Sequence, residues 1–188
     1  MLVDRSLADL LNRLAQHGTI RVIALVSAQY LLIVPVLAVV AAAINALRRR
    51  DVTKASLIAV TVAGTAAALA LNQVVGRLVF RARPYWAVSS IHALGTRATD
   101  SSFYSDHATL VAGLTLGLFF VARRGAPLAA GCAFFVAVGR VAVGAHYPSD
   151  VVVGACIGCA AVAGLLRFRP RIEALITVLP CFRRSVRE

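Results

Sequence analysis

Two long uncharged stretches constrain this chain more than any other feature. Residues 22–47 and 55–76 contain no charged side chain, and each exceeds the roughly 20 residues that a helix needs to cross a bilayer. Three later apolar stretches, 108–122, 125–139 and 151–166, fall short of that length, so each is expected to continue past polar residues. The pattern predicts five membrane-spanning helices.

Composition favours the same class of protein. The chain is 60% hydrophobic and 15% charged, against roughly 45–50% and 25% in an average soluble domain. A soluble domain of this size could not hide that much apolar surface. We therefore predict an all-α fold, a polytopic helical bundle with about five transmembrane helices. We expect a single domain over residues 1–188 without linkers, in which residues 20–167 form the bundle and 168–188 a basic cytoplasmic tail.

Residues 3–14 show a different pattern, with apolar residues on one helical face and polar or charged residues on the other. This predicts an amphipathic helix within residues 1–19 that lies in the membrane interface. Its acidic residues and the long first span argue against a secretory signal peptide.

The basic residues predict an orientation. The chain has 20 Lys+Arg against 8 Asp+Glu, a formal charge of +12. They lie between apolar runs and form no basic stripe with interleaved aromatic residues, so no nucleic-acid partner is expected. Five spans place twelve of the 20 basic residues on one side and eight on the other, and the richer side is expected to be cytoplasmic.

The residues capable of chemistry gather in three blocks, 76–86, 100–110 and 139–150. With that orientation, all three lie at the outer boundary of the membrane, which is the convergence that a functional site requires. Arg140 lies inside an apolar segment, where a charge costs several kcal/mol unless it faces a polar cavity and a partner.

The second block, together with arginines from the first and third blocks, predicts an anion site. Ser105 is a good N-cap, which leaves free backbone N–H groups and a positive helix end at Asp106 and His107. Guanidinium groups from Arg83 and Arg140 bind phosphate oxygens bidentately. Together these groups predict a phosphate or diphosphate pocket.

The third block predicts a nucleophile. His146 precedes Pro148, which suits the first turn of a helix. Asp150 falls in that turn, where it is expected to accept a hydrogen bond from Nδ1 of His146 and leave Nε2 free to attack phosphorus. His107 would then protonate the leaving oxygen.

Two alternatives stay open. His107, His146, Asp106 and Asp150 are also residue types that bind Zn²⁺ or Mn²⁺, although the neighbouring arginines would repel a cation. A transporter could also use the arginines to bind a lipid headgroup without hydrolysing it.

The three blocks resemble the type 2 phosphatidic acid phosphatase superfamily, and most of all the bacterial undecaprenyl-pyrophosphate phosphatases of the bacitracin-resistance type. The resemblance covers about residues 72–154, and the segment GAHYPSD, with Arg140 six residues before His146, is its most specific part. It implies that His146 forms a phosphohistidine, that Asp150 orients His146, and that His107 is the general acid. It also implies phosphate binding by Arg83, Ser105 and Arg140, with no metal and no cofactor.

The chain departs from the family pattern at several positions. Gly76 stands where the first motif usually has a lysine, so Arg77 or Arg81 is expected to substitute for it. Tyr104 replaces a proline of the second motif, and Gly139 replaces a serine that often precedes the third-motif arginine.

The resemblance implies hydrolysis of undecaprenyl pyrophosphate to the monophosphate and phosphate. The site would face the extracytoplasmic side of a bacterial inner membrane, with the lipid diphosphate and the bilayer as partners. Phosphatidylglycerophosphate and phosphatidic acid are the alternative substrates.

Overall fold

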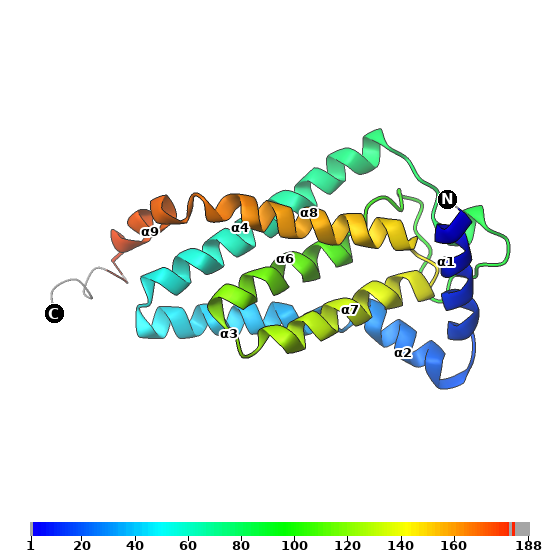
Figure 1. Ribbon diagram of the computed structural model, residues 1–188, viewed down its shortest axis with the longest axis horizontal. Helices are drawn as coiled ribbons and strands as arrows, with labels where there is room; N and C mark the ends of the chain where they lie inside the picture. The colour runs from blue at the N-terminus through cyan, green and yellow to red at the C-terminus, as the bar shows by residue number, and fades with distance from the viewer. Residues whose placement is uncertain (1, 181, 183–188) are drawn as a thin grey trace.

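The computed structural model describes residues 2–180 and 182, and all the regular secondary structure in them is helical (Figure 1). The elements are, in chain order, α1 (Leu2–Ala15), α2 (Gly18–Gln29), α3 (Ile33–Arg49), α4 (Val52–Leu78), α5 (Pro84–Ala87), α6 (Asp106–Val121), α7 (Ala126–Ala142), α8 (Pro148–Leu166) and α9 (Arg169–Thr177). Of the basic tail predicted for 168–188, residues 181 and 183–188 lie outside the described part of the chain.

The long helices run side by side along the molecule, and α1 crosses one end of the bundle, on the right of Figure 1. Helix α6 packs against α4, α7 and α8, while α1 packs against α2, α7 and α8. The loop that contains residues 88–105 lies at the same end as α1. The two turns that follow α3 and α6 point toward the opposite end.

The prediction of a membrane bundle with five spans is confirmed, because the structure contains an apolar helical segment for each predicted span. Three helical segments are long and apolar enough to cross a bilayer, namely Gly18–Arg49, Val52–Leu78 and Pro148–Leu166, and α6 and α7 are shorter apolar helices. As expected, the shorter stretches extend past polar residues. Helix α6 begins with Asp106 and His107, α7 continues past Arg140, and α8 includes Asp150.

The first span differs from the prediction because it is interrupted. Helices α2 and α3 are separated at residues 30–32. Pro35 has no N–H and its ring crowds the carbonyl of the residue four positions earlier, Leu31. That carbonyl accepts a hydrogen bond from Val34 N instead, at 3.2 Å. The apolar pattern predicted the length of the span but not its break.

Helix α1 confirms the predicted amphipathic helix. Its buried face consists of Ala8, Asn12 and Ala15, whereas its larger apolar side chains point outward and are exposed: Leu2, Val3, Leu7, Leu10 and Leu14. Asn12 fixes the helix to the bundle, because its Nδ2 donates to the carbonyls of Ala142 and His92, both at 2.8 Å. An outward apolar face on a helix across the bundle end is what an interfacial helix requires.

Glycines spaced four residues apart allow the central helices to approach closely. A Cβ built at Gly154 would lie 2.7 Å from the carbonyl oxygen of Ser105, and one at Gly158 would collide with the carbonyl oxygen of Thr109. Gly113 and Gly117 approach α4 in the same way, at Thr65 and Thr61.

We expect Gly158→Val to destabilise the bundle by about 2 kcal/mol, because the new side chain must push α8 away from the backbone of α6. For a chain of this size, that corresponds to a fall in Tm of roughly 4–8 °C, measured by thermal unfolding in detergent. Gly131→Val is the matched control, since nothing lies within 4 Å of a Cβ at Gly131. Equal melting temperatures for the two variants would contradict this account of the helix contact.

Candidate active site

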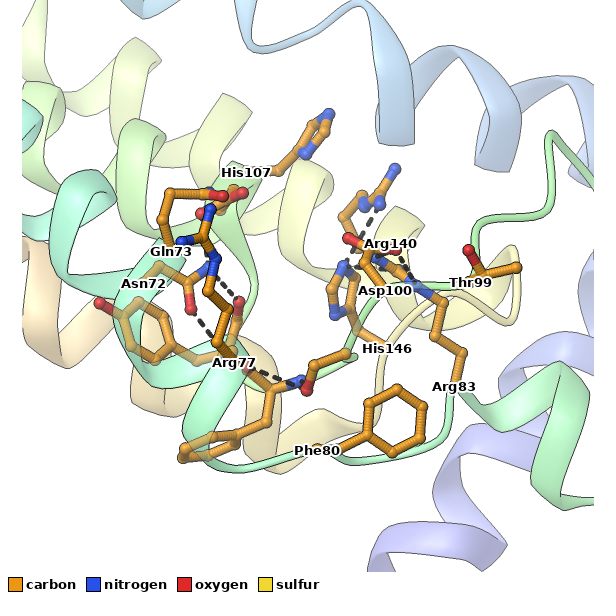
Figure 2. Close-up of a pocket in the computed structure, with 15 residues that line it drawn as sticks. Asn72, Gln73, Arg77, Phe80, Arg83, Thr99, Asp100, His107, Arg140 and His146 are labelled. Atoms are coloured by element: carbon orange, nitrogen blue, oxygen red, sulfur yellow. Dashed lines mark hydrogen bonds and ion pairs between the residues drawn. The ribbon is translucent and has the colours of Figure 1, made fainter.

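A pocket of 610 Å³ opens at the α1 end of the bundle (Figure 2). Residues from all three predicted blocks line it, so the structure brings these sequence-distant blocks together. Figure 2 shows Arg83, Asp100, Arg140 and His146 grouped on one side of the pocket, with Asn72, Gln73 and Arg77 across from them. Further lining residues are Gly76, Phe80, Thr99, Ser101, Phe103, Tyr104, Asp106 and His107.

Arg83 lies on an extended segment between α4 and α5. Helix α4 ends at Leu78, and Pro84 starts α5. Arg83 is buried; its Nη1 donates to the Ala145 carbonyl at 3.1 Å and lies 3.4 Å from Nε2 of His146. Its Nε and Nη2 donate to Asp100 Oδ1 at 3.2 and 2.9 Å. Because the Asp100 side chain is 68% exposed, a phosphate entering the pocket can displace it.

Arg140 approaches the same histidine from the last turn of α7. Its Nη2 lies 3.2 Å from Nε2 of His146. Among the described residues its buried Nε has no hydrogen-bond partner. A guanidinium that retains an unpaired donor at the edge of a pocket can bind an anion there.

His146 is fixed by a backbone carbonyl. Its Nδ1 lies 2.8 Å from the carbonyl oxygen of Ser102. A carbonyl can only accept a hydrogen bond, so Nδ1 carries the proton and Nε2 presents its lone pair toward the two arginines. Burial, together with the positive charges of Arg140 and Arg83, holds the pKa of His146 well below its ordinary value. A neutral imidazole with an accessible Nε2 is the form that can act as a nucleophile.

The expected hydrogen bond between His146 and Asp150 is not the one that the structure contains. The buried Asp150 carboxylate accepts from Tyr147 N at 2.9 Å and from Arg81 Nη1 at 2.5 Å. The position of Asp150 in the first turn of α8 directs its carboxylate back to the backbone N–H of Tyr147. The Ser102 carbonyl, and not Asp150, is therefore the partner of Nδ1 of His146.

Arg81 also differs from its prediction, whereas Arg77 lines the pocket. The guanidinium of Arg81 is bound by Asp4, Ser149 and Asp150, and Arg81 is absent from the pocket lining. The donors of Arg81 are directed toward α1 and α8, so Arg77 is the one of the two arginines that the structure places at the pocket.

The start of α6 agrees in part with the prediction. Ser105 is the N-cap, and its hydroxyl accepts from Ala108 N. That hydroxyl is buried and Ser105 does not line the pocket, whereas Asp106 and His107 do. Asp106 accepts a hydrogen bond from Nδ2 of Asn72 at 2.5 Å. The cap is confirmed, and direct phosphate binding by the Ser105 side chain has no support in this arrangement.

The departures from the family pattern at positions 104 and 139 have a structural reason. Tyr104 is buried and donates from its hydroxyl to the Ala68 carbonyl at 2.7 Å, which ties the second block to α4. A Cβ at position 139 would lie 2.7 Å from Ala28 N, so α2 leaves room for Gly139 but not for the serine that the family often has there.

The sequence patterns assigned no role to Asp4, Asn72, Asp100 or Ser102, although the last two lie in the second block. Asn72 carried a signal, since an amide in an apolar span requires a partner. Ser102 carried none, because it acts through its backbone carbonyl. Among residues 2–180 and 182, no group of three or more His, Cys, Asp or Glu side chains is arranged to hold a metal ion.

A comparison with known protein families matches the part of the chain that forms this pocket. The family model of the PAP2 superfamily matches residues 57–173. The undecaprenyl-diphosphatase BcrC of Bacillus subtilis is 34% identical over 104 residues, which cover 55% of this chain and 52% of the relative. The bacitracin transport permease protein BcrC of Bacillus licheniformis is 26% identical over 112 residues, 60% of this chain and 55% of the relative.

A lipid A 1-phosphatase of Rhizobium etli is 36% identical over 94 residues, which cover 47% of this chain and 40% of the relative. The matched part of the chain thus spans about half the length of these curated relatives, or less. No solved structure was found to match the chain.

Proposed function

Because the chain belongs to the PAP2 superfamily, we propose that it is a membrane lipid phosphatase that hydrolyses a polyprenyl diphosphate, undecaprenyl pyrophosphate, to the monophosphate and inorganic phosphate. One observation carries the proposal above the others. Nε2 of His146 faces the guanidinium groups of both Arg83 and Arg140, at 3.4 and 3.2 Å. A nucleophile between two phosphate-binding cations is suited to phosphoryl transfer.

In the proposed reaction, Nε2 of His146 attacks the terminal phosphorus, and the bond from that phosphorus to the bridging oxygen breaks. His107 donates a proton to the bridging oxygen, which leaves on the lipid monophosphate. A water molecule then attacks the phosphohistidine and gives its proton to His107, which releases phosphate and restores His146. Arg83 and Arg140 neutralise the charge on the transferred phosphoryl group throughout.

An apolar groove supports a lipid substrate. It has a volume of 330 Å³ and is lined by Leu32, Leu69, Leu110, Gln73, Asp106 and His107. The last three also line the polar pocket. The proposed acid, His107, therefore lies where a polar headgroup site and an apolar groove meet, which is where the leaving oxygen of a lipid diphosphate would be.

We expect Leu110→Trp to raise KM for undecaprenyl pyrophosphate about tenfold, because the larger ring fills a groove that would otherwise hold the tail. KM for a short-chain prenyl diphosphate is expected to change much less. Leu128→Trp is the control, since Leu128 is exposed on α7 and lies outside the groove. An equal rise in KM for both chain lengths would remove the groove from the proposal.

The distribution of charge supports an extracytoplasmic site. The basic residues of the α3–α4 and α6–α7 turns lie toward the end opposite α1 (Figure 1). If that end is cytoplasmic, as positively charged loops are, the pocket opens on the outer face.

The function is tested by phosphate release from undecaprenyl pyrophosphate, phosphatidylglycerophosphate, phosphatidic acid and lipid A, each with purified full-length chain and a chelator. We expect undecaprenyl pyrophosphate to be the preferred substrate. Preference for lipid A would instead follow the Rhizobium etli relative, and loss of activity in chelator would favour the metal alternative. Headgroup binding without phosphate release would favour the transporter alternative.

A further inference from the structure

Helix α1 contributes an acidic side chain to the start of α8. Oδ1 of Asp4 accepts from Ser149 N at 2.9 Å, and Oδ2 accepts from Ser149 Oγ at 2.7 Å. Ser149 lies in the first turn of α8, where backbone N–H groups have no partner within the helix. Asp4 therefore caps a helix that is 145 residues away in sequence, from a segment outside residues 57–173 that match the family.

The same carboxylate holds Arg81. Nη2 of Arg81 donates to Asp4 Oδ2 at 2.6 Å, while Nη1 donates to Ser149 Oγ at 2.7 Å and to Asp150 Oδ1 at 2.5 Å. The guanidinium lies 4.0 Å from the ring centroid of Tyr147. One guanidinium thus bridges two carboxylates, and the Asp4 and Asp150 side chains are only 14% and 0% exposed.

A hydrogen-bonded path leads from Arg81 to the nucleophile. Ser102 N donates to the carbonyl of Arg81 at 2.8 Å. The Ser102 carbonyl in turn accepts from Nδ1 of His146, also at 2.8 Å. Fixing Arg81 therefore fixes the carbonyl that sets the tautomer and the orientation of His146.

We propose that Asp4 is a positioning residue of the active site, which acts through Arg81 and Ser149 to hold His146 in its reactive orientation. The inference rests on the proposed function of this site. Asp4 touches neither substrate nor reacting atoms. Its effect is exerted through the extended segment that contains Arg81 and through the first turn of α8, which contains Ser149. Burial disfavours its charged form, but hydrogen bonds from Ser149 and Arg81 hold the pKa of Asp4 below its ordinary value, so it is a carboxylate at neutral pH.

The test is the isosteric change Asp4→Asn. It replaces one carboxylate oxygen with an amide nitrogen, which cannot accept the hydrogen bonds that Ser149 and Arg81 donate. We expect kcat to fall about tenfold, as misorientation of a reacting group does, while KM stays within about twofold because Arg83 and Arg140 are untouched. Asp4→Glu restores the charge and is expected to recover most of kcat. Asp9→Asn is the control on the same helix, since it removes a carboxylate paired with the exposed Arg13.

A double-mutant cycle with Arg81→Gln separates positioning from general destabilisation. If Asp4 acts through Arg81, then Asp4→Asn lowers kcat little further in the Arg81→Gln background. Additive losses, a wild-type kcat for Asp4→Asn, or a kcat loss that Asp9→Asn reproduces would each overturn the inference. An inactive wild-type protein would instead overturn the proposed function, so the two failures are distinguishable.

Discussion

Replacing His146 with asparagine is expected to reduce phosphate release from undecaprenyl pyrophosphate by about 10⁴-fold or more, as loss of a covalent nucleophile does. The amide nitrogen of asparagine can donate to the Ser102 carbonyl in place of Nδ1, so the loop is expected to keep its conformation. What is lost is Nε2, the atom that faces Arg83 and Arg140. The measurement is the initial rate of phosphate release at saturating substrate.

A second readout identifies the intermediate. Wild-type protein quenched during turnover of substrate labelled on the terminal phosphate should retain label in an acid-labile, base-stable form, as a phosphohistidine does, and His146→Asn should retain none. His92→Asn is the matched control, because His92 is exposed and lies outside the pocket. If His146→Asn released phosphate at the wild-type rate, the covalent mechanism would be wrong.

The sequence predicted the fold better than it predicted the contacts within the site. Apolar length predicted five spans, and the polar extensions of the shorter ones were correctly inferred from the thickness of the bilayer. The break at residues 30–32 follows from Pro35, but hydropathy alone does not register the loss of one backbone donor. Sequence patterns therefore predict those features that depend on the residues of one segment alone.

The contacts of Asp150 and Arg81 could not be predicted in the same way. Spacing alone places Asp150 near His146, but it does not reveal that Arg81 and the backbone of Tyr147 occupy both carboxylate oxygens. Those contacts depend on where α1 crosses the bundle, since Asp4 shares Arg81 with Asp150. Amphipathicity predicted that α1 is a helix but not which end of the bundle it covers.

Arg140→Gln is the change with the next largest expected effect. We expect kcat/KM to fall by about 10²–10³-fold, because a donor that stabilises transition-state charge is removed from the site of attack. Arg140→Lys keeps the charge but not the forked donor, so an intermediate loss for that variant would show that geometry matters beyond charge. Arg97→Gln is the control, since Arg97 is exposed and packs against Trp86 outside the pocket.

The pH profile of the same variant tests the electrostatics of the site independently. Burial and the charges of Arg140 and Arg83 lower the pKa of His146. In the free enzyme this histidine therefore stays neutral at pH values somewhat below the ordinary histidine pKa of about 6.5. The acidic limb of kcat/KM that reports His146 is therefore expected below pH 6.5. Removing the Arg140 charge raises the pKa of His146, so this limb moves to higher pH in Arg140→Gln. A limb that stayed in place would mean that Arg140 does not act on the protonation of His146, even if the rate fell as expected.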